Sequence, residues 1–246
     1  MRRVSAALAN AGKTLLGIHS RLRAPVSTLR FQMESAVKRL PSIIACYVIL
    51  LLSPQGQAAD LGSLVSSLKA GGHVIVVRHV ATDDSQKDIY PFKFDDMTAQ
   101  RQLSEAGREV ARQLGAAFRR IGMPIGEVYT SRLNRAVETG KLLAGRDVSP
   151  IDELTDSGAG SASAMANPDG RNAKLGRALR DLANTSPKPG LNNLVITHKT
   201  NIVDAFGKDF GDVREGEALV FKPSASGPAV LVTRVRAGEW ITQARG

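Results

Sequence analysis

Helical and strand-like patterns of apolar residues alternate along residues 60–246. Apolar positions spaced by three and four predict helices, whereas short runs rich in β-branched residues predict strands buried on both faces. Predicted helices cover residues 61–70, 104–121, 132–143 and 172–183. Predicted strands cover residues 73–78, 126–130, 148–154 and 193–198, with a late antiparallel pair at residues 218–223 and 229–235. The polar residues 81–101 and the Gly- and Ser-rich residues 157–170 are expected to form loops.

This order of elements is typical of an α/β fold, in which strands separated by helices pair in a parallel sheet. We therefore predict a three-layer α/β/α sandwich with a mostly parallel central sheet and helices on both faces. Ligands bind to such sheets beyond the carboxyl ends of the strands. Two predicted strands end in a histidine, at His79 and at His198. Both side chains are therefore expected at the edge of the sheet where a site forms.

The first 59 residues have the pattern of a targeting leader rather than of a domain. The apolar run Ile43–Leu52 has about the length of the hydrophobic region of a signal peptide. It is shorter than the ~20 residues that span a bilayer. Lys38 and Arg39 supply the preceding positive charge, and the small residues within 56–58 suit a cleavage site.

Met33 lies just upstream of this run, so translation is expected to start at Met33, or residues 1–32 form an extended leader. The domain organisation is then a leader, residues 1–59, and one domain, residues 60–246. Cleavage leaves that domain without a stable membrane span and places it in the bacterial periplasm or outside the cell. An uncleaved membrane anchor is the alternative, and no feature of the sequence indicates an oligomeric state.

The positive net charge is concentrated in the leader. The chain carries a formal net charge of +10, to which residues 1–59 contribute eight Lys or Arg and one Glu. Residues 60–246 contain 25 basic and 22 acidic residues, and this near balance argues against nucleic-acid binding by the domain. The single cysteine, Cys46, lies in the leader. The mature chain is therefore expected to have neither disulfides nor thiol chemistry.

Arg78 and His79 end the first predicted strand, where a buried guanidinium is costly unless an anion faces it. A fixed positive charge beside a histidine also disfavours a divalent metal ion, so we expect no metal and no other cofactor. Arginine binds phosphoryl oxygens in a bidentate manner, and the pair therefore indicates a phosphate pocket. His73 begins the same strand, roughly 20 Å away, and is expected to be a capping or solvent-facing residue.

Four segments carry motifs that occur in a fixed order. VVRHVAT at residues 76–82 is similar to RHGxT, and QLSEAGREVARQLG at residues 102–115 is similar to LTxxGxxQAxxLG. YTSRLNRAVETGKLL at residues 129–143 is similar to SSxxxRAxxTAxxL, and LVITHKTNI at residues 194–202 looks like a strand and loop with a second histidine. The chain thus resembles the histidine phosphatase superfamily, in its phosphoglycerate mutase-like branch, from about residue 74 to residue 223.

The resemblance implies a role for each matching residue. His79 corresponds to the nucleophile that takes the phosphoryl group as a phosphohistidine. Arg78 and Arg135 correspond to the arginines that bind the phosphate oxygens, and His198 to the histidine that forms a hydrogen bond with one of them. Thr82 matches a hydroxyl residue that often contacts phosphate.

Three further positions depart from the family pattern or lie beside it. Arg132 is either a substrate contact or a solvated charge. Lys199 stands where a small residue is common and either extends the positive pocket or is solvated. Val80 replaces the usual glycine after the nucleophile, and we expect it to crowd the backbone there.

The leaving oxygen needs a proton, so a carboxylic acid is expected near the site. The family often places this acid in an L-x-E segment after the third strand, which matches Asp156 in this sequence. Asp156 has a shorter reach than glutamate, and Glu153 and Asp152 remain alternatives.

The function expected from these residues is hydrolysis of small phosphomonoesters through a phosphohistidine intermediate on His79 by an exported phosphatase. A mutase is disfavoured because the chain is short and the leader directs it away from glycolysis. Two alternatives remain: a non-catalytic phosphate-binding module of the same fold, and a phosphatase that acts on phosphohistidine in proteins.

Overall fold

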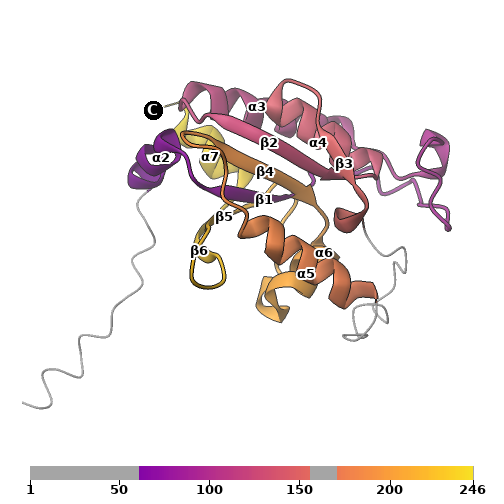
Figure 1. Cartoon of the computed structure of the whole chain (residues 1–246). Coiled ribbons are helices and arrows are strands. Elements are labelled where there is room, and N and C mark those ends of the chain that lie inside the picture. Colours follow the sequence, from indigo (N-terminus) through magenta and orange to yellow (C-terminus); the bar gives the residue numbers. More distant parts are fainter. Residues whose placement is uncertain (1–60, 156–170, 246) are drawn as a thin grey trace, which may run out of the picture. The chain divides into compact units, whose positions relative to one another are not determined.

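The computed structural model describes residues 61–155 and 171–245, and helices and strands alternate through them (Figure 1). The helices are α2 (Leu61–Ala70), α3 (Glu105–Arg120), α4 (Asn134–Ala144), α5 (Arg171–Ala183), α6 (Lys199–Phe206) and α7 (Ala237–Gln243). The strands are β1 (Val74–Arg78), β2 (Ile125–Ser131), β3 (Ser149–Ile151), β4 (Asn192–Thr197), β5 (Ala218–Lys222) and β6 (Val230–Val235). Short 3₁₀ helices are η1 (Met97–Ala99), η2 (Asp152–Leu154) and η4 (Lys208–Phe210).

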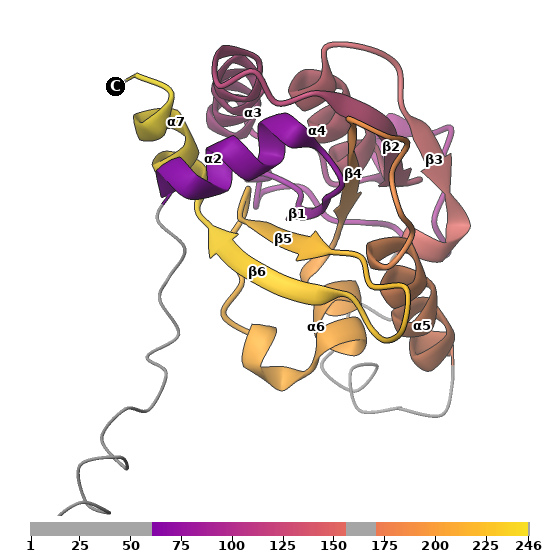
Figure 2. The ribbon, with the colours of Figure 1, turned by 60° about the vertical axis from the view of Figure 1, so that its left-hand side comes forward.

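The described strands form one sheet in the order β3-β2-β4-β1-β5-β6. The first four strands are parallel, and β5 and β6 add an antiparallel edge. Figure 2 shows this edge, with β5 and β6 side by side. At the centre of the sheet, Val77 pairs with Ile196 and Arg78 pairs with Thr197. This register brings the ends of β1 and β4, and the histidines that follow them, to the same level.

Helices cover both faces of the sheet, and the alternation of side chains along β1 explains why. Ile75 and Val77 pack into one apolar cluster with residues of α2, α3, α4 and α7. Val74 and Val76 point to the opposite face and pack against residues of α5 and α6. A strand that is apolar at every position requires apolar partners on both faces. The structure therefore confirms the predicted three-layer α/β fold with a mixed central sheet (Figure 1).

The ends of two helices near the site follow from local sequence. The Ser104 side chain accepts a hydrogen bond from the backbone N–H of Gly107 and caps α3, as the sequence predicts. Gly107 itself packs closely against the loop after β1. A Cβ atom at this position would lie 2.1 Å from the carbonyl oxygen of Ala81, so the contact requires a glycine. Gly145, with φ of 68°, ends α4 in the left-handed conformation.

Several sequence predictions need correction. Two helices, α6 and α7, were not expected, because eight and seven residues carry too little periodicity to stand out. Residues 152–154 form a 3₁₀ helix rather than the end of a strand. His73 is buried rather than solvent-facing. Its ring lies against Ser67, and its backbone N–H donates to the Asn192 side chain.

The leader and the predicted loop 157–170 lie outside the described residues. Among the helices that are described, none has the length and apolar character needed to cross a membrane.

Candidate active site

A cavity of about 530 Å³ opens beyond the carboxyl ends of β1 and β4. The backbone N–H of His79 donates to the carbonyl oxygen of Thr197 at 3.0 Å, which joins the two strand ends. The described residues that line the cavity are Arg78, His79, Asp84, Gln86, Lys87, Asp88, Arg101, Arg135, His198, Lys199 and Thr200. Four residues that the sequence placed in the site, Arg78, His79, Arg135 and His198, are therefore brought together.

His79 is buried and held in one tautomer. Its Nδ1 atom lies 2.8 Å from the carbonyl oxygen of Val80, and a carbonyl oxygen only accepts, so Nδ1 donates the hydrogen bond. The other ring nitrogen, Nε2, then carries a lone pair. Burial, followed by the charge of Arg135, lowers the pKa of His79 to about 3. The ring is therefore neutral at physiological pH and has the protonation state that a nucleophile requires.

His198 packs edge-on against His79, with 5.1 Å between the ring centroids. Its Nε2 atom lies 2.8 Å from the hydroxyl oxygen of Ser131, and that oxygen accepts the backbone N–H of Leu133 at 3.0 Å. The arrangement that satisfies most groups has the Ser131 hydroxyl donating to Nε2. The Nδ1 atom, buried and without a hydrogen-bond partner in the described residues, then carries the proton. Burial and the nearby Arg135 lower the pKa of His198 well below its usual value, so its ring is neutral too.

The two predicted phosphate-binding arginines are held in different ways. Arg78 follows the buried part of β1 and donates to the carbonyl oxygen of Val213 at 2.8 Å and to the carboxylate of Glu215 at 3.1 Å. Arg135 lies in the first turn of α4, is 3% exposed, and forms an ion pair of 2.9 Å with Asp88. Both guanidinium groups line the cavity, which therefore carries concentrated positive charge.

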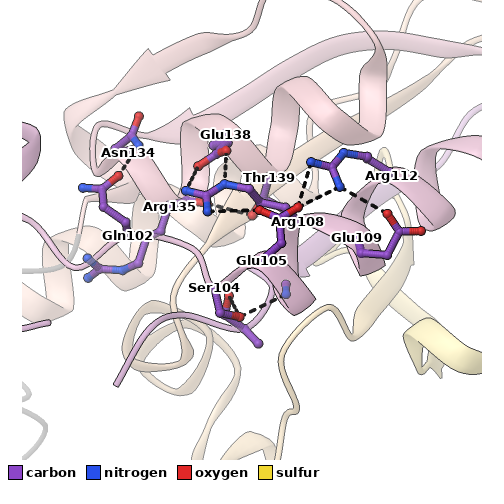
Figure 3. Close-up of polar contacts among 12 residues, drawn as sticks. Gln102, Ser104, Glu105, Arg108, Glu109, Arg112, Asn134, Arg135, Glu138 and Thr139 are labelled. Atoms are coloured by element: carbon purple, nitrogen blue, oxygen red, sulfur yellow. Dashed lines mark hydrogen bonds and ion pairs between the residues drawn. The ribbon is translucent and has the colours of Figure 1, made fainter. Parts of the chain in front are cut away.

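Polar contacts tie the helix that carries Arg135 to its surroundings (Figure 3). At its start, Asn134 donates from its backbone to Gln100 and from its side chain to Gln102. One turn later, Glu138 of α4 accepts two hydrogen bonds from Arg108 of α3. These contacts link α4 to α3 and to the segment that precedes α3, so the position of Arg135 depends on three parts of the chain.

Five cavity residues in the segment between β1 and α3 had no assigned role in the sequence analysis, and two of them, Arg101 and Asp88, act on the buried site residues. The Arg101 side chain is 35% exposed, and its charge contributes to the lowered pKa of both histidines. The carboxylate of Asp88 accepts both the backbone N–H of Arg101 and the Arg135 guanidinium, each at 2.9 Å. The segment reads as a polar loop, and no local motif distinguishes these two residues from the other charges around them.

The remaining predicted contacts are distributed around the cavity or away from it. Lys199 is exposed and lines the cavity at the start of α6. Thr82 is buried and is not among the described residues that line the cavity; its backbone bridges to Leu103, and its hydroxyl has no partner in the described residues. Arg132 is exposed, pairs with Asp152 at 3.0 Å and lies over the Phe94 ring, 4.1 Å from its centroid. Arg132 is not among the described residues that line the cavity, which favours the reading as a surface charge.

None of the acids that the sequence proposed as proton donor is placed in the described cavity wall. Glu153 and Asp152 are exposed and do not appear among the described lining residues. Asp156 lies outside the described residues. Within residues 61–155 and 171–245, no group of three or more His, Cys, Asp or Glu side chains is arranged to hold a metal ion.

Val80 does not crowd the strand end as expected. Its side chain is 1% exposed and belongs to the apolar cluster on the α3 side of the sheet. A Cβ atom at Gly216 would lie 3.4 Å from a Val80 methyl group and 3.7 Å from Leu114, which are ordinary packing distances, so Val80 packs beside Gly216 without a clash. Its carbonyl oxygen still points to His79. The departure from the family pattern therefore changes the core and leaves the hydrogen bond to the nucleophile in place.

Comparison with known families agrees with this site. Residues 74–200 match the model of the histidine phosphatase superfamily (branch 1), and the chain belongs to this superfamily. The match includes β1, β2, β4 and the elements between them, and it contains the partly exposed Arg78 and the three buried site residues His79, Arg135 and His198.

Solved structures of similar fold include the protein histidine phosphatase SixA complexed with tungstate, at 16% identity and a TM-score of 0.47, covering 68% of this chain and 97% of that one. A mutant phosphoserine phosphatase from Entamoeba histolytica in complex with phosphoserine is 15% identical, with a TM-score of 0.45 and coverage of 68% and 98%. The alpha-ribazole phosphatase from Shigella flexneri is 16% identical, with a TM-score of 0.45 and coverage of 65% and 96%. A search of curated proteins found no match.

Proposed function

We propose that the chain is a phosphatase that hydrolyses small phosphomonoesters through a phosphohistidine on His79. The observation that carries the proposal is the state of the His79 ring. The ring is neutral, its Nδ1 atom donates to a backbone carbonyl oxygen, and its Nε2 atom therefore carries a lone pair. His79 lines the cavity together with three arginines.

The first step is binding of the phosphoryl group. Arg78 and Arg135 neutralise its oxygens, and Nδ1 of His198 donates a hydrogen bond to one of them. Because both histidines are neutral and buried, the positive charge of the pocket comes from Lys87, Lys199 and the guanidinium groups of its arginines, which remain protonated at physiological pH values. Anion binding is therefore expected to persist across this range.

The second step is phosphoryl transfer. The lone pair on His79 Nε2 forms a bond to phosphorus while the bond to the leaving oxygen breaks, in line with the attack. The arginines stabilise the charge on the equatorial oxygens during transfer. Water then attacks the phosphohistidine, the P–N bond breaks, and inorganic phosphate leaves.

The leader adds a proposal about where this reaction takes place. We propose that residues 1–59 direct export, so that the domain acts on phosphoesters in the periplasm or outside the cell. Mass spectrometry of the N-terminus of the natural protein tests this, because a mature chain that retains Met1 contradicts it.

The proposed activity is tested with the full chain and the variant His79→Ala. We expect the wild type to hydrolyse p-nitrophenyl phosphate and to form an acid-labile phosphoenzyme, and the variant to do neither. Hydrolysis that is unchanged in His79→Ala contradicts the mechanism. Binding of inorganic phosphate by a wild type that hydrolyses no member of a phosphoester panel would instead support a binding module.

A further inference from the structure

The leaving oxygen requires a proton, and two carboxylates are among the described residues that line the cavity. The side chain of Asp84 is 95% exposed and pairs with the guanidinium of Arg101, at 4.0 Å. The side chain of Asp88 is 24% exposed and lies 2.9 Å from a terminal nitrogen of Arg135. Asp88 is thus the carboxylate that is joined to the phosphate-binding part of the cavity.

Asp88 is more exposed than the buried side chains of the site, and this difference favours a place on the side of the leaving group. His79, His198 and the Arg135 side chain are each about 3% exposed and form the inner wall. Attack from His79 in line with the breaking bond directs the leaving oxygen away from this wall, toward the open side. Asp88 lines the same cavity, contacts Arg135 and is more exposed than the residues of the inner wall, which favours a place on this open side.

The position of Asp88 is fixed by two donors from different parts of the chain. One of its oxygens accepts both the Arg135 guanidinium and the backbone N–H of Arg101. The next residue, Ile89, donates its backbone N–H to the carbonyl oxygen of Ala99 at 2.9 Å, which holds the segment closed across ten residues. The other carboxylate oxygen of Asp88 has no contact of this kind in the described residues and remains accessible to a ligand.

Substrate binding changes the surroundings of this carboxylate. A phosphoryl group that binds in the cavity competes with Asp88 for the guanidinium of Arg135. Asp88 and the bound phosphoryl group therefore share one cationic partner.

We propose that Asp88 is the proton donor of the reaction, an inference that rests on the phosphatase activity proposed above. In the transfer step the Asp88 carboxyl gives its proton to the leaving oxygen as the P–O bond breaks, and the product is a neutral alcohol. In the second step the carboxylate takes a proton from the attacking water as the P–N bond breaks. Each cycle consumes one water and leaves Asp88 protonated, the form in which it enters the transfer step.

The test compares Asp88→Asn with Asp84→Asn on two substrates. Asparagine keeps an oxygen that accepts from Arg135 and Arg101 but has no acidic proton. For glycerol 3-phosphate, whose alkoxide is a poor leaving group, Asp88→Asn is expected to lower kcat/KM by roughly 10²- to 10⁴-fold. For p-nitrophenyl phosphate, whose leaving group needs no proton, the loss in formation of the phosphoenzyme is expected to be under about 10-fold. Asp84→Asn removes a charge from the same cavity at a residue that pairs with Arg101, and it should change kcat/KM for the two substrates by the same factor.

Two results would overturn the role of Asp88. An equal loss on both substrates means that the carboxylate only orients Arg135, and an unchanged kcat/KM means that another group supplies the proton. Asp156→Asn serves as the competing variant. If kcat/KM for glycerol 3-phosphate falls only in Asp156→Asn, and Asp88→Asn is unaffected, the proton is assigned to Asp156. If the wild type hydrolyses neither substrate, or if His79→Ala is fully active, the proposed function itself fails.

Discussion

The lowered pKa of His79 predicts that the folded chain loses stability as the pH falls below about 6.5. In the unfolded chain the imidazole has an ordinary pKa of about 6.5 and takes up a proton in mild acid. In the folded chain burial lowers the pKa to about 3, so the ring stays neutral. Because the unfolded state binds more protons, the stability from this group is complete above pH 6.5 and is lost progressively toward pH 3.

The size of the effect follows from the two pKa values. Between about pH 7.5 and pH 5.5, a histidine that is neutral when folded reduces the free energy of unfolding by about 1.4 kcal/mol. His198 changes stability in the same direction because burial lowers its pKa as well. His73, whose pKa burial also lowers, adds to the dependence from outside the site.

Urea unfolding of the wild type and of His79→Gln at both pH values isolates the contribution of one residue. The buffer must contain no phosphate, because an anion bound to the arginines would stabilise the folded state. We expect the loss of stability between the two pH values to be smaller in His79→Gln by about 1.4 kcal/mol. Equal losses in the two proteins would refute the argument that His79 is buried and neutral in the folded state.

Two other substitutions test individual contacts. Val80→Ala removes two methyl groups from a residue that is 1% exposed. We expect thermal unfolding to show that the free energy of unfolding falls by about 2 kcal/mol, whereas phosphatase kcat stays within about 3-fold of the wild type. A large loss of kcat with full stability would contradict this role in the core. Ser131→Ala leaves Nε2 of His198 and the backbone N–H of Leu133 without their buried partner. We therefore expect kcat/KM to fall by about 10-fold and the free energy of unfolding to fall by about 2 kcal/mol. Ser131→Thr should restore kcat/KM because it keeps the hydroxyl. Equal activities of the Ala and Thr variants would show that the hydroxyl does not position His198.

Much of the fold is encoded in short-range patterns. The five residues of β1 are nearly all apolar, so the strand is buried on both faces and the sheet must have helices on each side. Ser104 caps α3 through a contact that spans three residues. Such features depend on neighbours in the sequence, and the period of apolar positions or the identity of one capping residue is enough to predict them.

The proposed role of Asp88 as proton donor and the packing of Val80 depend on contacts between distant segments. Asp88 reaches Arg135 across 47 residues, and Ser131 reaches His198 across 67. Val80 was expected to crowd the backbone, but its side chain packs in the apolar cluster beside Gly216, a residue far along the chain. No periodicity connects these positions. The sequence alone therefore does not distinguish Asp88 from the other charged residues near it, and it shows Val80 only as a departure from the usual glycine.

The sequence by itself thus determined the α/β class, the central strands and the four residues Arg78, His79, Arg135 and His198 that meet at their ends. These follow from local patterns and from motifs in which each residue stands on a predictable element. Only the tertiary structure decided the tautomer of each histidine, the pairing of Arg135 with Asp88 and the burial that keeps both imidazoles neutral. These properties depend on which groups surround a side chain in space, and only the folded chain brings those groups together.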